Sequence, residues 1–317
     1  MSTDAPRVAL AVPVYNGEAF LPALLDALRA QTEARWTAVI TDNASTDGTA
    51  EIARAASATD PRFRYARNET NLGANGNFNR SMAHALATGA PFVKWAACDD
   101  RLRPGFLAAC LGALDARPEA AGAHTGVVLV DEADRPYPFD AERGGFLDGD
   151  DVFRWTPDDW AALGSQDPGE RLFRFLHDKT GQSLIYGVFR RHAVAHAEPF
   201  AMPGVEDAVC AELVLAGPLA FVDRPLFEQR LHPGSARRMS RRDYIEYETG
   251  VRPTGLLLPS GGRAVAFARG IARARLSLAD RARAAVGLAR FAVGLGRLKN
   301  LVVPGPDNYF GLGAERA

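Results

Sequence analysis

The sequence has almost no net charge and little lysine or cysteine. Its 37 Lys and Arg residues against 38 Asp and Glu give a formal charge of −1, which excludes the net basic face of a general nucleic-acid binder. Three of the basic residues are lysines and 34 are arginines, a bias that indicates a GC-rich genome rather than a function. The cysteines Cys98, Cys110 and Cys210 fit neither a disulfide framework nor a zinc site, so we expect a reducing, cytoplasmic location.

Other signals are also missing. No signal-peptide apolar region follows Met1, and no uncharged apolar run reaches the roughly 18 residues of a membrane-spanning helix. No Gly-x-Gly-x-x-Gly follows the first predicted strand, which disfavours a dehydrogenase. Residues 11–16 also lack the Gly-rich signature with Arg and Lys of a nucleotidyltransferase. The 317 residues, 47% hydrophobic and 24% charged, nevertheless supply a large core. Their number favours two domains, or one with an appendage.

Apolar runs alternate with helical patterns along the first 130 residues. The runs have the length and the ends of buried strands, whereas the segments between them repeat apolar residues at three- and four-residue spacing. We expect strands at 8–12, 36–40, 63–66, 91–97 and 125–130, and helices at 17–30, 47–56, 75–87 and 104–116. This alternation predicts an α/β fold with right-handed crossovers and a mainly parallel sheet flanked by helices.

Polar side chains stand where several of these strands end. Asn16, Asp42, Asn71 and the pair Asp99–Asp100 all follow a predicted strand directly or lie in the loop after one. Ligands of such sheets bind beyond the carboxyl ends of the strands. The sequence therefore predicts that these residues share one site.

The pattern changes twice later in the chain. Between 131 and 169, Gly, Pro and acidic residues dominate, so we expect an insertion or mobile loop near the site. Stretch 262–301 holds nine basic side chains against Asp280 alone, interleaved with apolar residues, which predicts one or two basic amphipathic helices. We place a catalytic domain at 1–235 and a basic, mainly helical region at 236–317. Between the two changes, regular elements are expected at 170–177, 183–189, 206–215 (a helix), 219–222 and 226–231 (two strands).

Four segments carry a family resemblance. They are Ala-Val-Pro-Val-Tyr-Asn (11–16), Thr-Asp-Asn-Ala-Ser-Thr-Asp-Gly-Thr (41–49), Asn-Leu-Gly-Ala-Asn-Gly-Asn-Phe-Asn (71–79) and Cys-Asp-Asp-Arg-Leu-Arg-Pro (98–104). In this order the chain resembles, over roughly residues 5–235, the inverting family 2 glycosyltransferases of the Rossmann-like GT-A fold. The resemblance implies transfer of a sugar from a UDP-, dTDP- or GDP-sugar to a carbohydrate, lipid-linked or other hydroxyl acceptor, in polysaccharide, glycolipid or other glycoconjugate biosynthesis. A degenerate nucleotide-sugar-binding module without transferase activity is the alternative.

The resemblance also implies a donor and metal site. The donor nucleotide would contact Pro13, Val14, Tyr15, Asn16, Asp42, Asn71, Gly73, Asn77 and Asp99. Asp100 would bind Mn²⁺ or Mg²⁺, with Asp99 in the ribose or metal shell, because these hard cations prefer carboxylate and phosphate oxygens. The resemblance also implies His232 as a further ligand through a neutral imidazole. Ala97 stands where many relatives carry another Asp. Two alternatives stay open: the acids cap the helix that Pro104 opens, and Gly73 is a plain helix-start glycine.

Inversion requires a base for the acceptor hydroxyl. The segment Pro-Gly-Val-Glu-Asp at 203–207 resembles the acidic pair of the family, so Asp207 would be the base and Glu206 would support it. The alternative is that this acidic pair stabilises the dipole of its helix. The resemblance places Tyr186, Gly187 and Arg190 on the acceptor side. Further candidates for lining the acceptor pocket are Trp95, Trp155, His177 and Gln182.

The basic C-terminal stretch admits three interpretations. It packs on the catalytic domain and exposes its arginines, it lies peripherally on the inner face of an anionic membrane with its apolar side inserted, or it forms a homodimer interface. The second would suit a lipid-linked acceptor.

Overall fold

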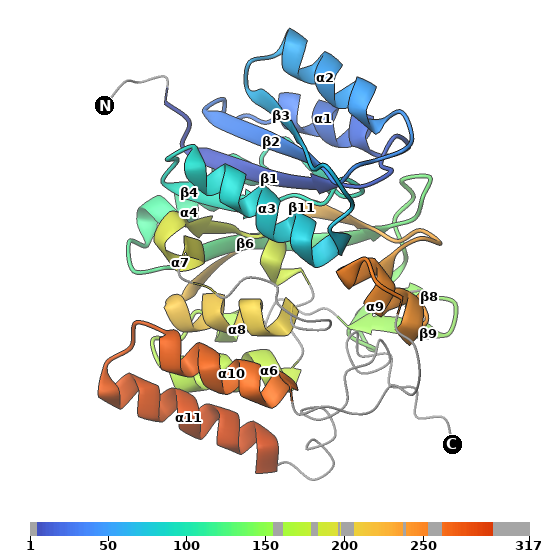
Figure 1. The fold of residues 1–317 in the computed structure, drawn as a ribbon. Coiled ribbons are helices and arrows are strands. Elements are labelled where there is room, and N and C mark those ends of the chain that lie inside the picture. The colour runs from blue at the N-terminus through green and yellow to red at the C-terminus, as the bar shows by residue number, and fades with distance from the viewer. Residues whose placement is uncertain are drawn as a thin grey trace.

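An eight-stranded mixed sheet forms the centre of the protein, with helices on both faces (Figure 1). The computed structural model describes residues 5–154, 161–178, 183–195, 197, 206–236, 239–252 and 262–293. The strand order is β3-β2-β1-β4-β10-β6-β11-β5. These strands are β1 (Val8–Val14), β2 (Trp36–Asp42), β3 (Phe63–Arg67), β4 (Phe92–Trp95), β5 (Arg101–Leu102), β6 (Gly122–Val130), β10 (Val188–Arg190) and β11 (Leu219–Arg230).

The first four strands of this sheet are parallel, as the sequence predicts. Every residue of β1 and β2 is buried, because helices cover both faces of the sheet. In α1 the buried Leu21, Leu24, Leu25 and Leu28 follow the helical repeat and pack on one face. The N-terminal helices are α1 (Leu21–Arg29), α2 (Thr49–Thr59), α3 (Gly73–Ala87) and α4 (Phe106–Ala116).

The second half of the sheet departs from the predicted order. The three-residue strand β10 pairs antiparallel with both β4 and β6. It therefore lies between the strands predicted at 91–97 and 125–130, which follow one another in the sequence pattern. The two strands predicted at 219–222 and 226–231 are one strand, β11, which pairs parallel with β6 and has register shifts around Pro225. Proline donates no ladder hydrogen bond and interrupts the apolar run. The prediction therefore split one strand in two.

Residues 139–154 are ordered as a small sheet rather than as a mobile loop. The antiparallel strands β7 (Phe139–Asp140), β8 (Gly145–Asp148) and β9 (Asp151–Arg154) form it, with Gly149 in the left-handed region between β8 and β9. The acidic and Gly-rich composition that predicts a loop belongs to the tight turns of this sheet. Trp155 and Trp160 lie outside the described residues.

The last helices pack against the sheet domain. They follow α6 (Pro168–Asp178), η1 (Leu184–Tyr186), α7 (Arg191–Ala195) and α8 (Glu206–Ala216), and they are α9 (Arg241–Thr249), α10 (Gly262–Arg273) and α11 (Leu278–Val293). Phe267, Ile271 and Phe291 are buried in the same core cluster as residues of α6 and α8. At Gly287 an added Cβ would lie 2.2 Å from the carbonyl oxygen of Gly169, so α11 and the start of α6 touch through their backbones.

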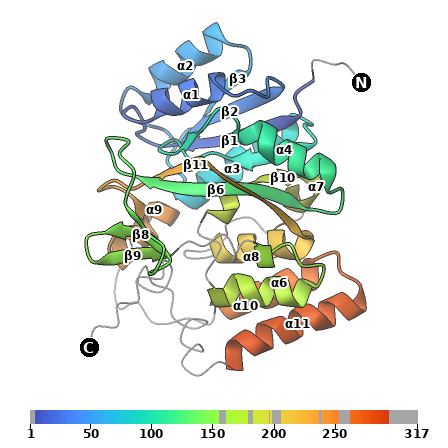
Figure 2. The same cartoon turned by 180° about the vertical axis from the view of Figure 1, so that it is seen from behind.

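This packing realises the first of the three interpretations for α10 and α11. Of the apolar residues predicted for these helices, Phe267, Ile271 and Phe291 cover α6 and α8, whereas others lie on the exposed side of α11. Contact with a membrane and a homodimer interface both stay predictions. The predicted stretch 262–301 divides into two helices, and residues 294–301 lie outside the described part of the chain. In the part of the chain that is described, no helix is both long and apolar enough to cross a bilayer. Figure 2 shows α11 as the outermost layer of the molecule, opposite α2.

Candidate functional site

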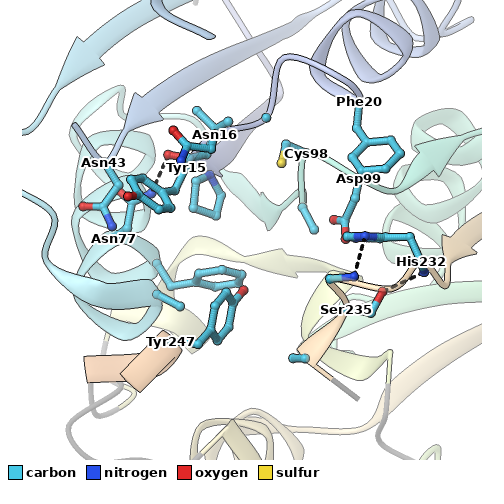
Figure 3. A pocket seen from close by; sticks show the side chains of 18 of the residues that line it. Tyr15, Asn16, Phe20, Asn43, Asn77, Cys98, Asp99, His232, Ser235 and Tyr247 are labelled. Atoms are coloured by element: carbon cyan, nitrogen blue, oxygen red, sulfur yellow. Dashed lines mark hydrogen bonds and ion pairs between the residues drawn. The ribbon is translucent and has the colours of Figure 1, made fainter. Parts of the chain in front are cut away.

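A cavity of about 610 Å³ lies where β1, β4 and β11 end at their carboxyl termini (Figure 3). The predicted residues Pro13, Val14, Tyr15 and Asn16 line it after β1. Ala97, Asp99 and Asp100 line it after β4, and Arg230 and His232 line it after β11. The structure therefore brings Asn16, Asn71 and the pair Asp99–Asp100 to one cavity, as the α/β topology predicts, but Asp42 is not among the lining residues.

The loop after β1 is fixed by the loop after β2. Asn16 has a φ of 48°, which is uncommon for a residue other than glycine. Its side-chain Oδ1 accepts a hydrogen bond from the Thr46 backbone amide at 2.8 Å, and the Asn16 backbone amide donates to Ser45 Oγ at 2.9 Å. The Gly17 amide donates to Thr49 Oγ1 at 2.8 Å. The motif 41–49 thus positions the first loop of the cavity.

Four asparagines form a hydrogen-bonded cluster at one end of the cavity. Asn43 Nδ2 donates to Asn71 Oδ1 at 2.7 Å, and Asn43 Oδ1 accepts from Asn68 Nδ2 at 2.9 Å. Asn68 Nδ2 also donates to Asn77 Oδ1 at 3.1 Å, and Asn77 Nδ2 donates to the carbonyl oxygens of Val14 and Thr41. We call these four residues the asparagine cluster. Asn43 and Asn68 were not singled out from the sequence, although Asn43 stands inside the second motif.

Asp42 lies beside the cavity and does not line it. Its side chain is fully buried, and it accepts hydrogen bonds from the Ser45 amide at 2.8 Å, from the Tyr65 hydroxyl at 2.8 Å and from the Arg67 guanidinium. Burial alone would raise the pKa of Asp42, but the bonds from Ser45, Tyr65 and Arg67 outweigh it and hold the pKa below its ordinary value. Asp42 shapes the cavity through Asn43, and its contact with a nucleobase stays a prediction.

Acidic and basic groups meet at the other end of the cavity. Asp99 Oδ2 lies 3.2 Å from His232 Nε2, and the His232 ring packs on Phe20 with ring centroids 4.8 Å apart. Asp100 is buried, and its Oδ1 accepts from the Arg230 amide at 3.0 Å. Arg230 Nε donates to the Asp99 carbonyl at 2.8 Å. We call Asp99, Asp100, Arg230 and His232 the charged end. The sequence analysis predicts no role for Arg230, which stands two residues before His232.

Burial, and then the neighbouring Asp99, raise the pKa of Asp100 well above its usual range. The two adjacent carboxyl groups are hard oxygen donors, the His232 imidazole adds a nitrogen donor, and a divalent cation would relieve the repulsion between the two carboxylates. Asp99, Asp100 and His232 therefore suit such an ion chemically. No group of three His, Cys, Asp or Glu side chains among the described residues is arranged to hold one by itself. The remaining ligands would have to come from a diphosphate or water.

Helix α9 forms a wall of the cavity that the sequence does not predict. Tyr247 lines the cavity near the asparagine cluster and is 44% exposed (Figure 3). The helix docks on α3 at Gly73, whose φ is +71° and where an added Cβ would lie 2.5 Å from the Glu248 carbonyl oxygen. Gly73 starts α3 and does not line the cavity, as in the helix-start alternative. The predicted domain boundary at 235 divides the cavity, because Ser235, Ala236 and α9 all line it.

The predicted acceptor-side residues are separated from one another. Tyr186 lines the cavity, but at Gly187 an added Cβ would lie 2.8 Å from the Ala123 carbonyl oxygen, so this glycine permits close strand packing. Arg190 pairs in register with Phe92 at the start of β4, and its guanidinium donates to the Ala120 and Leu114 carbonyls at 2.8 and 2.7 Å. Arg190 therefore lies at the end of the strands opposite to the cavity.

The remaining candidates lie around the cavity rather than in it. Asp207 is half-buried in the first turn of α8 and is not among the lining side chains. Trp95 Nε1 donates to the Phe78 carbonyl at 3.2 Å, and His177 packs on Phe173. The side chain of Glu206 and the whole of Gln182 lie outside what the structure describes.

The chain resembles known proteins in sequence. Residues 9–162 match the model of the family described as Glycosyl transferase family 2. The putative glycosyltransferase EpsH of Bacillus subtilis is 24% identical over 259 residues, which are 78% of this chain and 68% of that protein. The uncharacterized protein y4gI of Sinorhizobium fredii is 33% identical over 121 residues, 37% of this chain. The chain covers 13% of y4gI.

Solved structures agree in fold. S. aureus TarS residues 1–349 superpose with a TM-score of 0.59 at 17% identity, over 92% of this chain and 73% of that chain. The chain covers 44% of a longer TarS structure. TarS 1–349 has also been solved with UDP, with a TM-score of 0.58, and with UDP-GlcNAc, with a TM-score of 0.57.

Proposed function

This chain is a member of glycosyltransferase family 2 with a GT-A fold, and we propose that it transfers a sugar from a nucleoside diphosphate to an acceptor hydroxyl with inversion. The observation that carries the proposal is one cavity with a neutral amide cluster at one end and paired acids at the other. Amide and backbone groups can read a nucleoside by hydrogen bonds. The paired acids would suit a group that gains negative charge as it leaves once a divalent cation lies between them and that group.

The donor would span the cavity. We place its nucleoside between Tyr15, the asparagine cluster and Tyr247, because aromatic faces and amides lie together there. The diphosphate would then reach Asp99, Asp100 and His232. The TarS complexes with UDP and UDP-GlcNAc support a uridine donor as the first to test.

A divalent cation belongs to the same proposal. Asp100, Asp99 and His232 would hold Mn²⁺ or Mg²⁺, which when bound neutralises charge on the departing diphosphate. Arg230 would keep this end in place whether or not the ion is bound. Its amide and guanidinium tie Asp100 and the Asp99 backbone to β11.

We assign Asp207 as the base. As the bond from the acceptor oxygen to the anomeric carbon forms, the bond from that carbon to the diphosphate oxygen breaks, and the hydroxyl proton passes to a carboxylate. Helix α8 packs on η1, whose Tyr186 lines the cavity. Glu206 would support the base or bind the acceptor. Carbohydrate, lipid-linked and other hydroxyl acceptors all remain candidates, and a reducing cytoplasm remains the proposed location.

A donor screen tests the function. Thermal shift with UDP-, GDP-, dTDP- and CDP-sugars and Mn²⁺ should show a raised melting temperature for one nucleotide class. Release of the nucleoside diphosphate from that donor should require Mn²⁺ and stop with EDTA. Binding without any turnover would identify a sugar-nucleotide-binding module, and the absence of both would contradict the proposed function.

A second experiment isolates the base. We expect Asp207→Asn to abolish transfer to an acceptor while donor binding in the thermal-shift assay stays unchanged. Asp223→Asn, an exposed acid on β11 outside the cavity, is the matched control and should keep full activity. Near-normal turnover of Asp207→Asn would remove this residue from the role.

A further inference from the structure

Helix α11 has an apolar face that the fold does not use. Its inner face, with Ala284, Gly287 and Phe291, is buried against the rest of the protein. On its outer side Leu278 is 86% exposed, Val286 is 59% exposed and Val293 is 83% exposed. These are among the most exposed large apolar side chains of the described residues. A surface helix normally turns polar residues outward, so this second apolar face requires another explanation.

The exposed residues form one continuous stripe. At about 100° per residue, Leu278, Ala282, Val286, Ala289 and Val293 fall within an arc of about 80°, on the side opposite the buried face. Ala282 and Ala289 are exposed as well. The stripe runs the length of a 16-residue helix. Ser277, whose hydroxyl accepts from the Asp280 amide, fixes the start of that helix. We call these five residues the outer stripe.

Arginines lie on both sides of the outer stripe. By the same helical geometry, Arg281 falls on one flank, and Arg283 and Arg290 fall on the other. The exposed Arg275 precedes the helix, and Arg269 is exposed on the neighbouring α10. Residues 262–293 contain seven arginines and Asp280 as the only acid. Arg283 is paired with Asp280 and Arg290 with Glu170, and the excess of arginine over acid on α10 and α11 still makes this outer layer basic, although the whole chain carries a formal charge of −1.

The charge distribution distinguishes two occupants. A second copy seated on the stripe would bring arginines of one chain against arginines of the other, and interface cores are depleted of charge. An anionic bilayer offers an apolar interior for the stripe and negative headgroups for its flanks. We propose that the outer stripe of α11 binds the surface of an anionic lipid membrane, with the helix lying in the plane of the interface.

This proposal is independent of the sugar-transfer proposal. It rests on a face of the molecule that contributes no side chain to the cavity. Binding to lipid is read without any activity. In addition, α11 is the outermost layer in both views (Figures 1 and 2), so the stripe reaches a flat surface before any other described element on that side.

Vesicle flotation tests the apolar contribution. The full chain should float with vesicles of equal parts phosphatidylglycerol and phosphatidylcholine, and much less with phosphatidylcholine alone. The triple variant Leu278→Ser, Val286→Ser, Val293→Ser should bind about tenfold more weakly or worse. Because the three side chains are exposed, the variant should keep the wild-type melting temperature. Val251→Ser changes a valine that is 68% exposed far along the chain from α11 and should float like the wild type.

The arginines provide a second test. Arg269→Gln and Arg275→Gln should each weaken binding to the phosphatidylglycerol vesicles about fivefold, and added salt should weaken the wild type most. Equal flotation of wild type and triple variant, or no flotation of the wild type, would overturn the proposal. A wild-type dimer by light scattering that the triple variant converts to a monomer would instead assign the stripe to a second copy. Nucleoside diphosphate release from a soluble donor should be the same in all these variants.

Discussion

The two ends of the cavity are built from different interactions. The asparagine cluster is neutral, and its amides are bonded to one another and to the backbone ends of β1 and β2. The charged end places two acids, an imidazole and an arginine together, and burial raises the pKa of Asp100. The amides of the first end satisfy one another, whereas the second end places two carboxyl groups side by side. This difference indicates that the first end is a preformed recognition surface and that the second requires its ligand.

The largest expected effect breaks the charged end. We expect Asp100→Asn to lower turnover of the preferred donor by about 10² or more, because it removes the carboxylate that would hold the cation at the leaving group. The thermal shift with the nucleoside alone should be nearly unchanged, since the asparagine cluster is intact. Asp26→Asn, at an exposed acid of α1, is the control. Equal losses in nucleoside binding and in turnover would show that the two ends do not act separately.

Gly73→Ala should act on the other end through α9. Alanine at a φ of +71° is strained, and its Cβ would meet the backbone of residues 248–250 at about 2.5 Å, so we expect about 2–4 kcal/mol of lost stability in urea unfolding. Gly89→Ala is the matched control, because Gly89 has a φ of +80° with nothing within 4 Å. It should cost only about 1 kcal/mol. Similar losses in both would mean that the contact with α9 adds nothing.

Asn77→Ala should weaken the asparagine cluster itself. The substitution removes donors to the Val14 and Thr41 carbonyls and the acceptor for Asn68, all buried. Unpaired buried groups should cost about 2 kcal/mol of stability and raise the KM for the donor, with kcat little changed. The same change at Asn79 on the same helix, outside the cavity lining, should leave KM unaltered. A fall in kcat alone would argue against a recognition role.

Fold stability should depend on pH through a buried histidine outside the cavity lining. His124 of β6 is buried against Phe106 and Phe227, and burial lowers its pKa to about 3, against an ordinary value of 6.5. As the pH falls below about 6.5, His124 becomes protonated in the unfolded chain but stays neutral in the folded chain. The free energy of unfolding therefore decreases. The loss should reach about 1.4 kcal/mol near pH 5.5. His124→Gln should flatten this slope in urea unfolding at several pH values, and His192→Gln, at an exposed site, should not.

The smallest effect concerns the wall that α9 adds. Tyr247→Ala should raise the Kd for the donor nucleotide about three- to tenfold, whereas Tyr247→Phe should keep the wild-type value if stacking is the interaction. Titration of the nucleotide by calorimetry would measure both. A loss in the phenylalanine variant equal to that in the alanine variant would assign the role to the hydroxyl instead.

Local signals predict the parts of the fold that local interactions determine. The buried runs of β1, β2 and β4 and the repeat of leucines in α1 are visible in the sequence, and the loops after them do converge. Strand β10 is three residues long, and its place between β4 and β6 depends on pairings with distant residues. No periodicity encodes that place.

The same limit applies to the site. Asp42 stands at a strand end as predicted, but its Oδ2 accepts from Tyr65 and Arg67 on the neighbouring strand β3 and its Oδ1 accepts from the Ser45 amide. The pattern of apolar residues in α9 predicts an amphipathic helix at most. It does not predict that this helix packs on the start of α3 at Gly73. The net charge of residues 262–301 has the same limit. It counts together the arginines on the side that packs against the protein and those on the exposed side.

The position of β10 determines which fragments of this chain can fold by themselves. The segment that matches the family, 9–162, contains β4 and β6 but not the strand that joins them. A fragment ending there would leave two unpaired strand edges facing each other, an arrangement that promotes aggregation. On the ribosome, too, the two halves of the sheet stay unjoined until residues 188–190 have been made. Excision, fusion and domain-swap experiments should therefore keep the chain intact through β11 and α9.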